Sequence, residues 1–320
     1  MSSILYNINF QLNRLIPVTT PLAVALGLFL PGVFINLRPF VIVLFGFMTF
    51  SGALKLTARE LGAAVKNPVP ILLFFVSSHI LMPFAALLLS SAFISNPDII
   101  TGFVLLFAGP TAVSGFIWVS IFKGDKALAL TLILLDTMLA PFVVPVTLSV
   151  FIGAKVTMDM SGIALSLFLM VVVPTIAAVA LNEFSRGKIP QVICPAVEPF
   201  AKICLILVIA ANSSAVAHNV RFDDFLFWGI ALLCIILTAT GFFLAKLNGI
   251  ASGCVTKTKS SGEKSASLVI AGGLRNNSAV MTIAVTFFPE AAVLPALLSI
   301  IFQQIITVIM GRILIKKTAE

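Results

Sequence analysis

The stretch Ala271-Gly-Gly-Leu-Arg-Asn-Asn-Ser-Ala279 decides how the rest of the chain is interpreted. It has the composition of a loop, yet apolar runs flank it at 265–270 and 280–288. A charged, glycine-rich segment at membrane depth is costly unless it lines a cavity or is buried in protein. A second break, Gly109-Pro-Thr-Ala-Val-Ser-Gly115, lies about half the chain earlier. Paired interruptions in corresponding halves indicate the substrate site of a secondary transporter.

The composition is that of a helical protein with many membrane spans. The chain is 60% hydrophobic and 10% charged, whereas a soluble domain carries about a quarter charged residues. A net charge of +8 would suggest a nucleic-acid partner in a soluble protein, but here topology explains it and no nucleic acid is expected. The four cysteines lack metal-ligand spacing, and no nucleophile–base constellation is visible. We therefore expect no metal, no cofactor and no enzyme activity.

Windows of about 20 apolar residues predict ten transmembrane helices. The predicted spans are 15–36, 39–56, 69–93, 99–122, 127–152, 160–183, 198–218, 223–246, 265–288 and 291–315. Short polar linkers join them, and the longest is 248–264. The N-terminus lacks the pattern of a signal peptide, so the first span is expected to be uncleaved.

The basic residues support the span count. Most lysines and arginines fall in linkers on the side of the two termini, while Arg38, Lys155 and Arg221 fall in linkers on the other side. Because cytoplasmic loops are enriched in positive charge, both termini are predicted to be cytoplasmic. The expected location is a plasma membrane, of the bacterial inner-membrane type.

Ten spans divide into two halves of five, residues 1–155 and 156–320. Because five is odd, the second half enters the membrane from the opposite side, and the halves become inverted repeats. The two breaks then fall in spans four and nine and are predicted to cross near the bilayer midplane. The predicted fold class is therefore an all-α integral membrane protein whose ten helices form two inverted five-helix repeats.

Three ionisable side chains lie well inside predicted spans: His79, Asp136 and Arg275. A lone charge in hydrocarbon costs on the order of several kcal/mol, so Asp136 and Arg275 each need a partner or water. They could be partners of each other, either as a pair that only stabilises the fold or with Asp136 carrying a coupling proton. His79 could be a core histidine bonded to a backbone carbonyl or a second candidate proton carrier.

Polar groups around Arg275 predict an anion site. The candidate substrate-binding residues are Arg275, Asn276, Asn277 and Ser278 of one break, Thr111 and Ser114 of the other, and Gln303 and Gln304 of the last span. Broken helices leave free backbone N–H groups and positive dipole ends where their second halves begin. Arg275 adds a full positive charge that is not removed by deprotonation. An anionic substrate is therefore favoured over a cation or a neutral sugar.

Three local patterns resemble the bile acid:sodium symporter family. They are Gly52-Ala-Leu-Lys-Leu56 with Lys66-Asn-Pro68, Gly109-Pro-Thr-Ala112 running through Lys123-Gly-Asp-Lys-Ala-Leu128 to Pro141, and Gly273-Leu-Arg-Asn-Asn-Ser278. The resemblance covers most of the chain. It implies a core domain of residues 69–152 and 223–315 and a panel domain of residues 15–56 and 160–218. It also implies alternating access between these domains, with small carboxylates or steroid conjugates as substrates.

The chain departs from that family where the resemblance implies sodium ligands. The ligand positions that the resemblance implies are occupied by Gly115-Phe116, Ala129, Ile133, Ala271 and Arg275, a glutamine of the third span is replaced by Ser78, and Asn276 is the position that still matches. Sodium needs several oxygen ligands, and a guanidinium beside its site would repel it. We therefore expect little sodium dependence, and the coupling ion stays open between sodium, a proton and uncoupled exchange.

These observations predict a secondary transporter for small organic anions. The expected partners are the anion, membrane lipid and either sodium or protons. The alternative is a membrane receptor or scaffold that keeps the transporter fold but does not cycle. Glycine-rich breaks in a polar core favour transport, because a scaffold does not need them.

Overall fold

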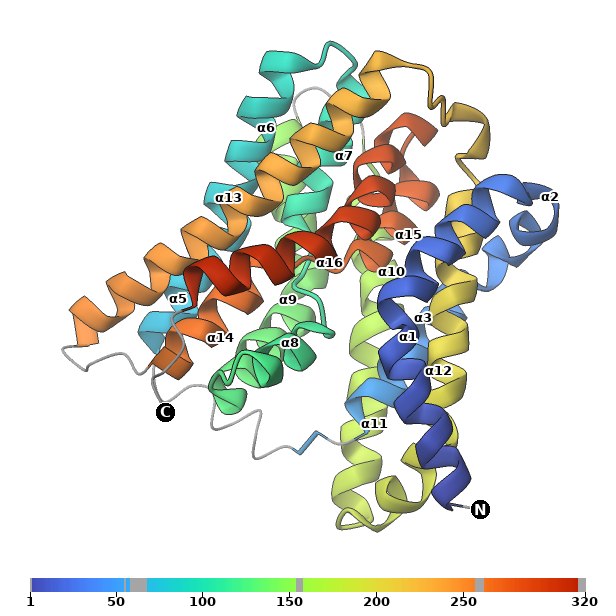
Figure 1. Ribbon diagram of the computed structural model, residues 1–320, viewed down its shortest axis with the longest axis vertical. Coiled ribbons are helices and arrows are strands. Elements are labelled where there is room, and N and C mark those ends of the chain that lie inside the picture. The colour runs from blue at the N-terminus through green and yellow to red at the C-terminus, as the bar shows by residue number, and fades with distance from the viewer. Residues whose placement is uncertain (1, 55, 58–67, 154–157, 257–261, 316–320) are drawn as a thin grey trace.

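The computed structural model describes residues 2–54, 56–57, 68–153, 158–256 and 262–315 (Figure 1). Within these residues all regular secondary structure is helical, and there is no strand. The predicted linker at 57–68 and Lys155, which entered the topology prediction, lie almost wholly outside the described residues.

The helices follow the predicted spans in order. The first half contains α1 (Ser2–Phe29), α2 (Pro31–Phe34), η1 (Ile35–Phe40), α3 (Val41–Ala53), α5 (Pro68–Val76), η3 (Ser77–Leu81), α6 (Met82–Phe93), α7 (Pro97–Ala108), α8 (Gly115–Ile121) and α9 (Lys126–Ile152). The second half contains α10 (Met160–Leu167), η4 (Phe168–Val172), α11 (Val173–Phe184), α12 (Lys188–Ser214), η5 (Ala217–Asn219), α13 (Phe225–Thr256), α14 (Gly262–Gly273), α15 (Asn277–Phe287), η6 (Glu290–Val293) and α16 (Leu294–Leu314).

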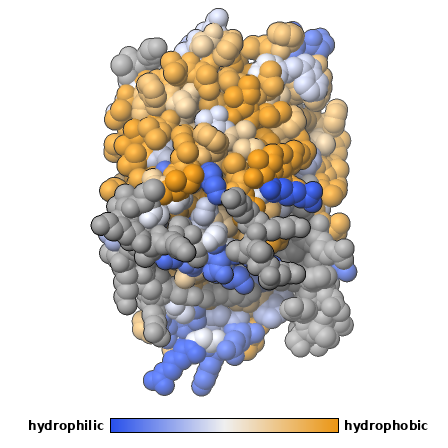
Figure 2. Space-filling view, turned by 60° about the vertical axis from the view of Figure 1, so that its left-hand side comes forward, coloured by the Kyte–Doolittle hydropathy of each residue, from blue (hydrophilic) through white to orange (hydrophobic). Residues whose placement is uncertain are grey.

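Among the described residues, eight of these helical stretches are long and apolar enough to cross a membrane. Two further apolar helical stretches are shorter: Val18–Phe29, which is the last part of α1, and Pro97–Ala108, which is α7. Figure 2 shows a broad hydrophobic band on one face of the molecule, with hydrophilic residues gathered mainly towards its lower end. The chain is therefore a multi-pass membrane protein, and the count of ten spans remains a prediction.

Side chains at the helix ends explain where several helices begin. The Asn96 side chain accepts hydrogen bonds from the N–H groups of Asp98 and Ile99 at the start of α7. Asp125 accepts from the N–H of Leu128 at 3.0 Å and so begins α9. Short side chains that carry an oxygen satisfy N–H groups that have no partner in the first helical turn.

The helices form two groups that stand side by side (Figure 1). One group contains α5–α9 and α13–α16, and the other contains α1–α3, α11 and α12. Helix α10 packs against α9 and α15 of the first group and continues through the π turn η4 into α11 of the second. One buried polar contact joins the groups, where the Asn212 amide of α12 donates to the Thr282 hydroxyl of α15 at 2.9 Å.

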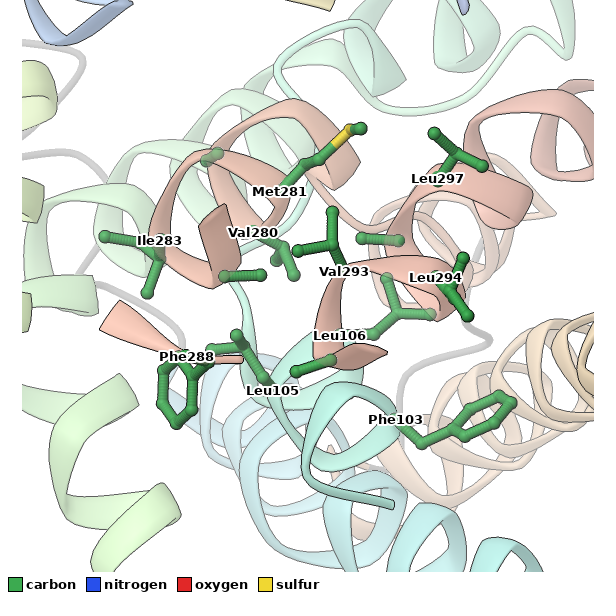
Figure 3. Packing of buried hydrophobic residues seen from close by; sticks show 14 of the residues in the cluster. Phe103, Leu105, Leu106, Val280, Met281, Ile283, Phe288, Val293, Leu294 and Leu297 are labelled. Atoms are coloured by element: carbon green, nitrogen blue, oxygen red, sulfur yellow. The ribbon is translucent and has the colours of Figure 1, made fainter. Parts of the chain in front are cut away.

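The main hydrophobic core lies where α7, α15 and α16 meet (Figure 3). Phe103 and Leu106 of α7 are fully buried, as is Met281 of α15, and Val293 lies beside them just before α16. Gly102 allows this packing, because a Cβ there would lie 2.2 Å from the carbonyl oxygen of Ala292. The core therefore surrounds the second half of the broken span nine and the first half of the broken span four.

The structure shortens the linker predicted at 248–264. Helix α13 continues to Thr256, and α14 begins at Gly262. The buried amide of Asn248 donates to the Ser77 hydroxyl at 2.6 Å, so packing against the first half of the chain stabilises the helix where its sequence turns polar. The predicted linker was wrong at its N-terminal end because a polar side chain was taken as a sign of solvent exposure.

Candidate functional site

The two breaks lie directly against each other. The Asn276 N–H of the second break donates to the Pro110 carbonyl of the first at 2.8 Å. The Thr111 hydroxyl lies within hydrogen-bond distance of two carbonyl oxygens of the second, those of Ala271 at 2.6 Å and Leu274 at 3.1 Å. Helix α7 packs on α15, and α8 packs on α14. The predicted contact between the breaks is therefore present, whereas the midplane position and the inverted repeat remain predictions.

Each break is narrower than the polar stretch that marks it. Gly272 and Gly273 belong to α14, and Leu274–Asn276 alone separate it from α15. A Cβ on Gly273 would lie 2.3 Å from the ring of Phe242, so this glycine serves close packing against α13 instead of forming a loop. Asn276 begins α15 by accepting from the N–H of Ala279.

Asp136 connects the first break to the third predicted span. It is fully buried on α9, and its Oδ2 accepts from the backbone N–H of Thr111 at 2.6 Å. Its Oδ1 lies 2.6 Å from Nε2 of His79. The Arg275 guanidinium donates to the Leu274 carbonyl, and its other two nitrogens have no partner among the described residues, so the sequence-based suggestion that Asp136 and Arg275 form a direct pair was wrong. The charge of Asp136 still acts on Arg275 at longer range.

His79 lies on the π-helical turn η3, and the next helix explains that turn. Pro83 has no N–H to donate to the His79 carbonyl four residues earlier, as an α-helix requires. Met82 instead donates to the Ser77 carbonyl, five residues back, and the Thr147 hydroxyl lies 3.4 Å from the His79 carbonyl. Single π turns inside α-helices are frequent at functional sites.

The backbone of Arg275 is fixed by hydrogen bonds, whereas two of its three guanidinium nitrogens have no partner among the described residues. Gln303 of α16 accepts from the Arg275 N–H through Oε1 and donates to the Arg275 carbonyl through Nε2, both at 3.0 Å. The guanidinium is 2% exposed, and its Nη1 donates to the Leu274 carbonyl at 3.2 Å. Its Nε and Nη2 are buried without a partner. These two nitrogens form the edge of a guanidinium that binds a carboxylate through two parallel hydrogen bonds.

The other predicted site residues lie either beside Arg275 or on the helices around it. Asn277 donates to the Ser299 hydroxyl of α16 at 3.0 Å, and its side-chain oxygen is buried without a partner. The backbone carbonyl of Ser278 accepts from Thr282, the residue that contacts the second helix group. Gln304 accepts from the indole of Trp118 on α8, and Ser114 is exposed at the start of that helix.

Hydrocarbon surrounds four of the positions where sodium ligands were expected, whereas the Ser78 hydroxyl is buried without a partner among the described residues. Ala129 and Ala271 are fully buried, and Ile133 is 2% exposed. A Cβ on Gly115 would lie 3.4 Å from Leu274 Cδ1 and 3.9 Å from Ile133 Cδ1. Among the residues that the structure describes, no group of three or more His, Cys, Asp or Glu side chains could hold a metal ion.

Asn212 and Thr282 are the polar residues that sequence reasoning missed at this centre. Both lie in long apolar stretches, and each is no more than 2% exposed. An amide in a predicted span was a usable signal, because a buried amide needs a partner from another helix.

Comparison with known proteins places these features in context. The sequence model of the Sodium Bile acid symporter family matches residues 41–221. The Bacillus subtilis (strain 168) protein YbaS is 36% identical over 299 residues, which cover 93% of this chain and 96% of that protein. The sodium-dependent transporter YocS of the same organism is 21% identical over 271 residues, covering 85% and 81%. The probable chloroplastic sodium/metabolite cotransporter BASS2 of Oryza sativa subsp. japonica is 23% identical over 240 residues, covering 74% and 57%.

Proposed function

Because the chain belongs to the Sodium Bile acid symporter family, we propose that it moves small organic anions across a membrane by alternating access. It is a secondary transporter and not an enzyme. The proposed substrates are small carboxylates or steroid conjugates related to bile acids.

The unpaired edge of Arg275 is the observation that carries this proposal. A buried guanidinium without an ion-pair partner is unfavourable, and a carboxylate or sulfonate bound to Nε and Nη2 would satisfy both donors and the charge. Asn276, Asn277 and the start of α15 lie beside it, where a helix N-terminus adds positive potential. The same edge is inaccessible to solvent, so an anion reaches it after the surrounding helices move.

The two helix groups are the parts that would move. We assign α5–α9 and α13–α16 to the core domain and α1–α3 and α10–α12 to the panel domain, the latter because α10 continues into α11. Polar contacts between the groups include Asn212 with Thr282 and Arg38 with the Val285 carbonyl at 3.2 Å. Sliding or rocking of packed helix groups against each other would break and remake such contacts.

The proposed transport depends little on sodium. Hydrocarbon fills the surroundings of Gly115 and Ile133, and Arg275 adds a positive charge to the same region. The location proposed for the protein is a bacterial inner membrane with both termini in the cytoplasm.

Uptake and binding measured together test the function. The protein is reconstituted into liposomes, and uptake of radiolabelled cholate and lactate is compared with their binding in detergent. We expect uptake, and we expect Arg275→Gln to abolish binding and uptake with little loss of fold, because Gln303 bonds to the backbone of residue 275 and not to its side chain.

The control variant is Arg312→Gln, which replaces an exposed arginine of α16. It should leave anion binding and uptake unchanged. Binding without uptake would favour the receptor or scaffold. Binding that survives Arg275→Gln in a folded protein would refute the anion site.

A further inference from the structure

We propose that the His79–Asp136 pair is a proton-binding site coupled to the anion site, so that each monoanion bound at Arg275 is accompanied by one proton on this pair. The inference rests on the proposed anion site at Arg275. It assigns the proton to His79, whose Nε2 lies 2.6 Å from the Asp136 carboxylate.

The charges of the buried centre require a proton when an anion enters. Without an anion, Arg275 carries one positive charge and Asp136 one negative charge, so the centre is neutral while His79 is neutral. A bound monoanion adds a negative charge, and protonation of His79 makes the centre neutral again. A neutral centre is favoured because unbalanced charge is expensive in a desolvated interior. Anion and proton therefore bind cooperatively, and each raises the affinity for the other by the same factor.

His79 can adopt both states without a change in its protein contacts. Neutral His79 with its proton on Nε2 donates to Asp136, and protonated His79 makes the same hydrogen bond. In both states Nδ1 has no protein partner, so no second hydrogen bond fixes the ring in one form. Phe75, whose ring is stacked at 5.5 Å, contributes no charge.

Asp136 connects the His79–Asp136 pair to the two breaks through Thr111. Its second oxygen accepts from the Thr111 N–H, and the Thr111 hydroxyl contacts the Leu274 carbonyl. The same carbonyl accepts from Nη1 of Arg275. A continuous series of short contacts therefore joins His79 to the guanidinium.

Other ionisable groups on the packed helices lie away from this centre. On the described parts of α5–α10, α13, α14 and η4, and on the capping residues of α9 and α10, they are Asp98, Asp125, Lys126, Asp159, Cys234, Lys246, Glu263 and Lys264. Of the charged members, Lys246 of α13 contacts the Ser265 hydroxyl of α14 at 3.4 Å, and the others lie at helix ends. Cys234 is 3.4 Å from the Pro295 carbonyl at the start of α16. His79, Asp136 and Arg275 are thus the ionisable groups at the centre among the described residues.

Anion binding by two neutral variants, Asp136→Asn and His79→Gln, shows whether the pair binds a proton or only stabilises the fold. Anion binding is measured by calorimetry with cholate as probe between pH 6 and pH 9, with protein stability followed at each pH. In the wild type, affinity should fall up to about tenfold for each pH unit above the His79 transition, as one coupled proton requires.

Asp136→Asn removes the negative charge, so cholate should bind with high affinity at every pH. His79→Gln keeps the hydrogen bond but cannot take a proton, so binding should be weak at every pH. Asp98→Asn, a carboxylate replaced at the start of α7, should behave as the wild type. A wild-type pH profile in folded Asp136→Asn or His79→Gln would overturn the proposal.

A spectroscopic measurement observes the proton on His79 directly. The chain has two histidines, and His218 is exposed, so His218→Gln leaves His79 as the single imidazole signal in a nitrogen NMR spectrum. The signal should show a proton added to His79 when cholate binds, and Asp136→Asn should abolish that addition. An imidazole that gains no proton on cholate binding would refute the proton site. Binding of neither cholate nor lactate would count against the proposed anion function, and binding without a change at His79 would count against the proton site alone.

Discussion

The two breaks occupy corresponding positions in the chain, but they are held in different ways. The second break is three residues long, and one glutamine side chain binds both the N–H and the carbonyl of its central residue. The first break covers residues 109–114, begins at Gly109 directly after α7, and is held at Thr111 by a carboxylate. The fixed positive charge thus lies on the more tightly held break, and the His79–Asp136 pair contacts the longer one through Asp136. This difference indicates that the two halves have separate tasks, one in holding the anion and one in responding to it.

Loss of the two hydrogen bonds from Gln303 to the backbone of Arg275 should have the largest effect, and that effect should be on stability. Gln303→Leu leaves the buried N–H and carbonyl of Arg275 without partners, and each unsatisfied group costs about 1–3 kcal/mol. We expect a destabilisation of about 2–4 kcal/mol, measured as a lower unfolding midpoint in detergent. The neighbouring Gln304→Leu loses one hydrogen bond to Trp118 and should cost about 1 kcal/mol or less. Equal losses in the two variants would show that the second break is not specially held.

Replacement of the Arg275 guanidinium by another positively charged group should have the next largest effect, and that effect should be on anion affinity. Arg275→Lys keeps a positive charge but loses the planar edge formed by Nε and Nη2. Cholate affinity should fall about tenfold, which corresponds to about 1.4 kcal/mol for the loss of one of two parallel hydrogen bonds. Calorimetry measures the change, and an unaltered affinity would mean that the charge alone holds the anion.

A smaller effect is expected where the two breaks touch. Thr111→Val removes the hydroxyl that lies near the Ala271 and Leu274 carbonyls but keeps the backbone N–H that donates to Asp136. Polar contacts between membrane helices are worth about 0.6–1.7 kcal/mol, so stability should fall by about 1 kcal/mol. The pH profile of cholate binding should keep its wild-type slope, because the contact to Asp136 persists. A flattened profile would place the coupling in the hydroxyl.

Replacement of sodium should have the smallest effect. Uptake and binding of cholate in sodium should differ from those in choline, at equal ionic strength, by less than about twofold, since hydrocarbon surrounds four of the expected ligand positions. A steep and saturable requirement for sodium would show that backbone carbonyls of the breaks rebuild a cation site.

Sequence reasoning was most successful where polar residues interrupt long apolar runs. The interruptions at 109–115 and 271–279 predicted two breaks, and the Asn276–Pro110 and Thr111–Leu274 contacts place them together. It was least successful for partners in three dimensions. The partner of Asp136 is His79 and not Arg275, because the register of α9 against η3 depends on the extra residue of a π turn, which spacing alone does not reveal. The length of α13 was missed for a similar reason, since Asn248 bonds to Ser77 far away in the sequence.

The hydrogen bond between Asn212 and Thr282 contributes a definite share to the preference of the protein for one conformation over another. If the two helix groups slide past each other during a cycle, this bond exists in one arrangement and is lost in another. A bond of about 0.6–1.7 kcal/mol corresponds to a population ratio of roughly three to eighteen. Removal of this amide alone would therefore redistribute molecules between states by about one order of magnitude, without any contact to the anion.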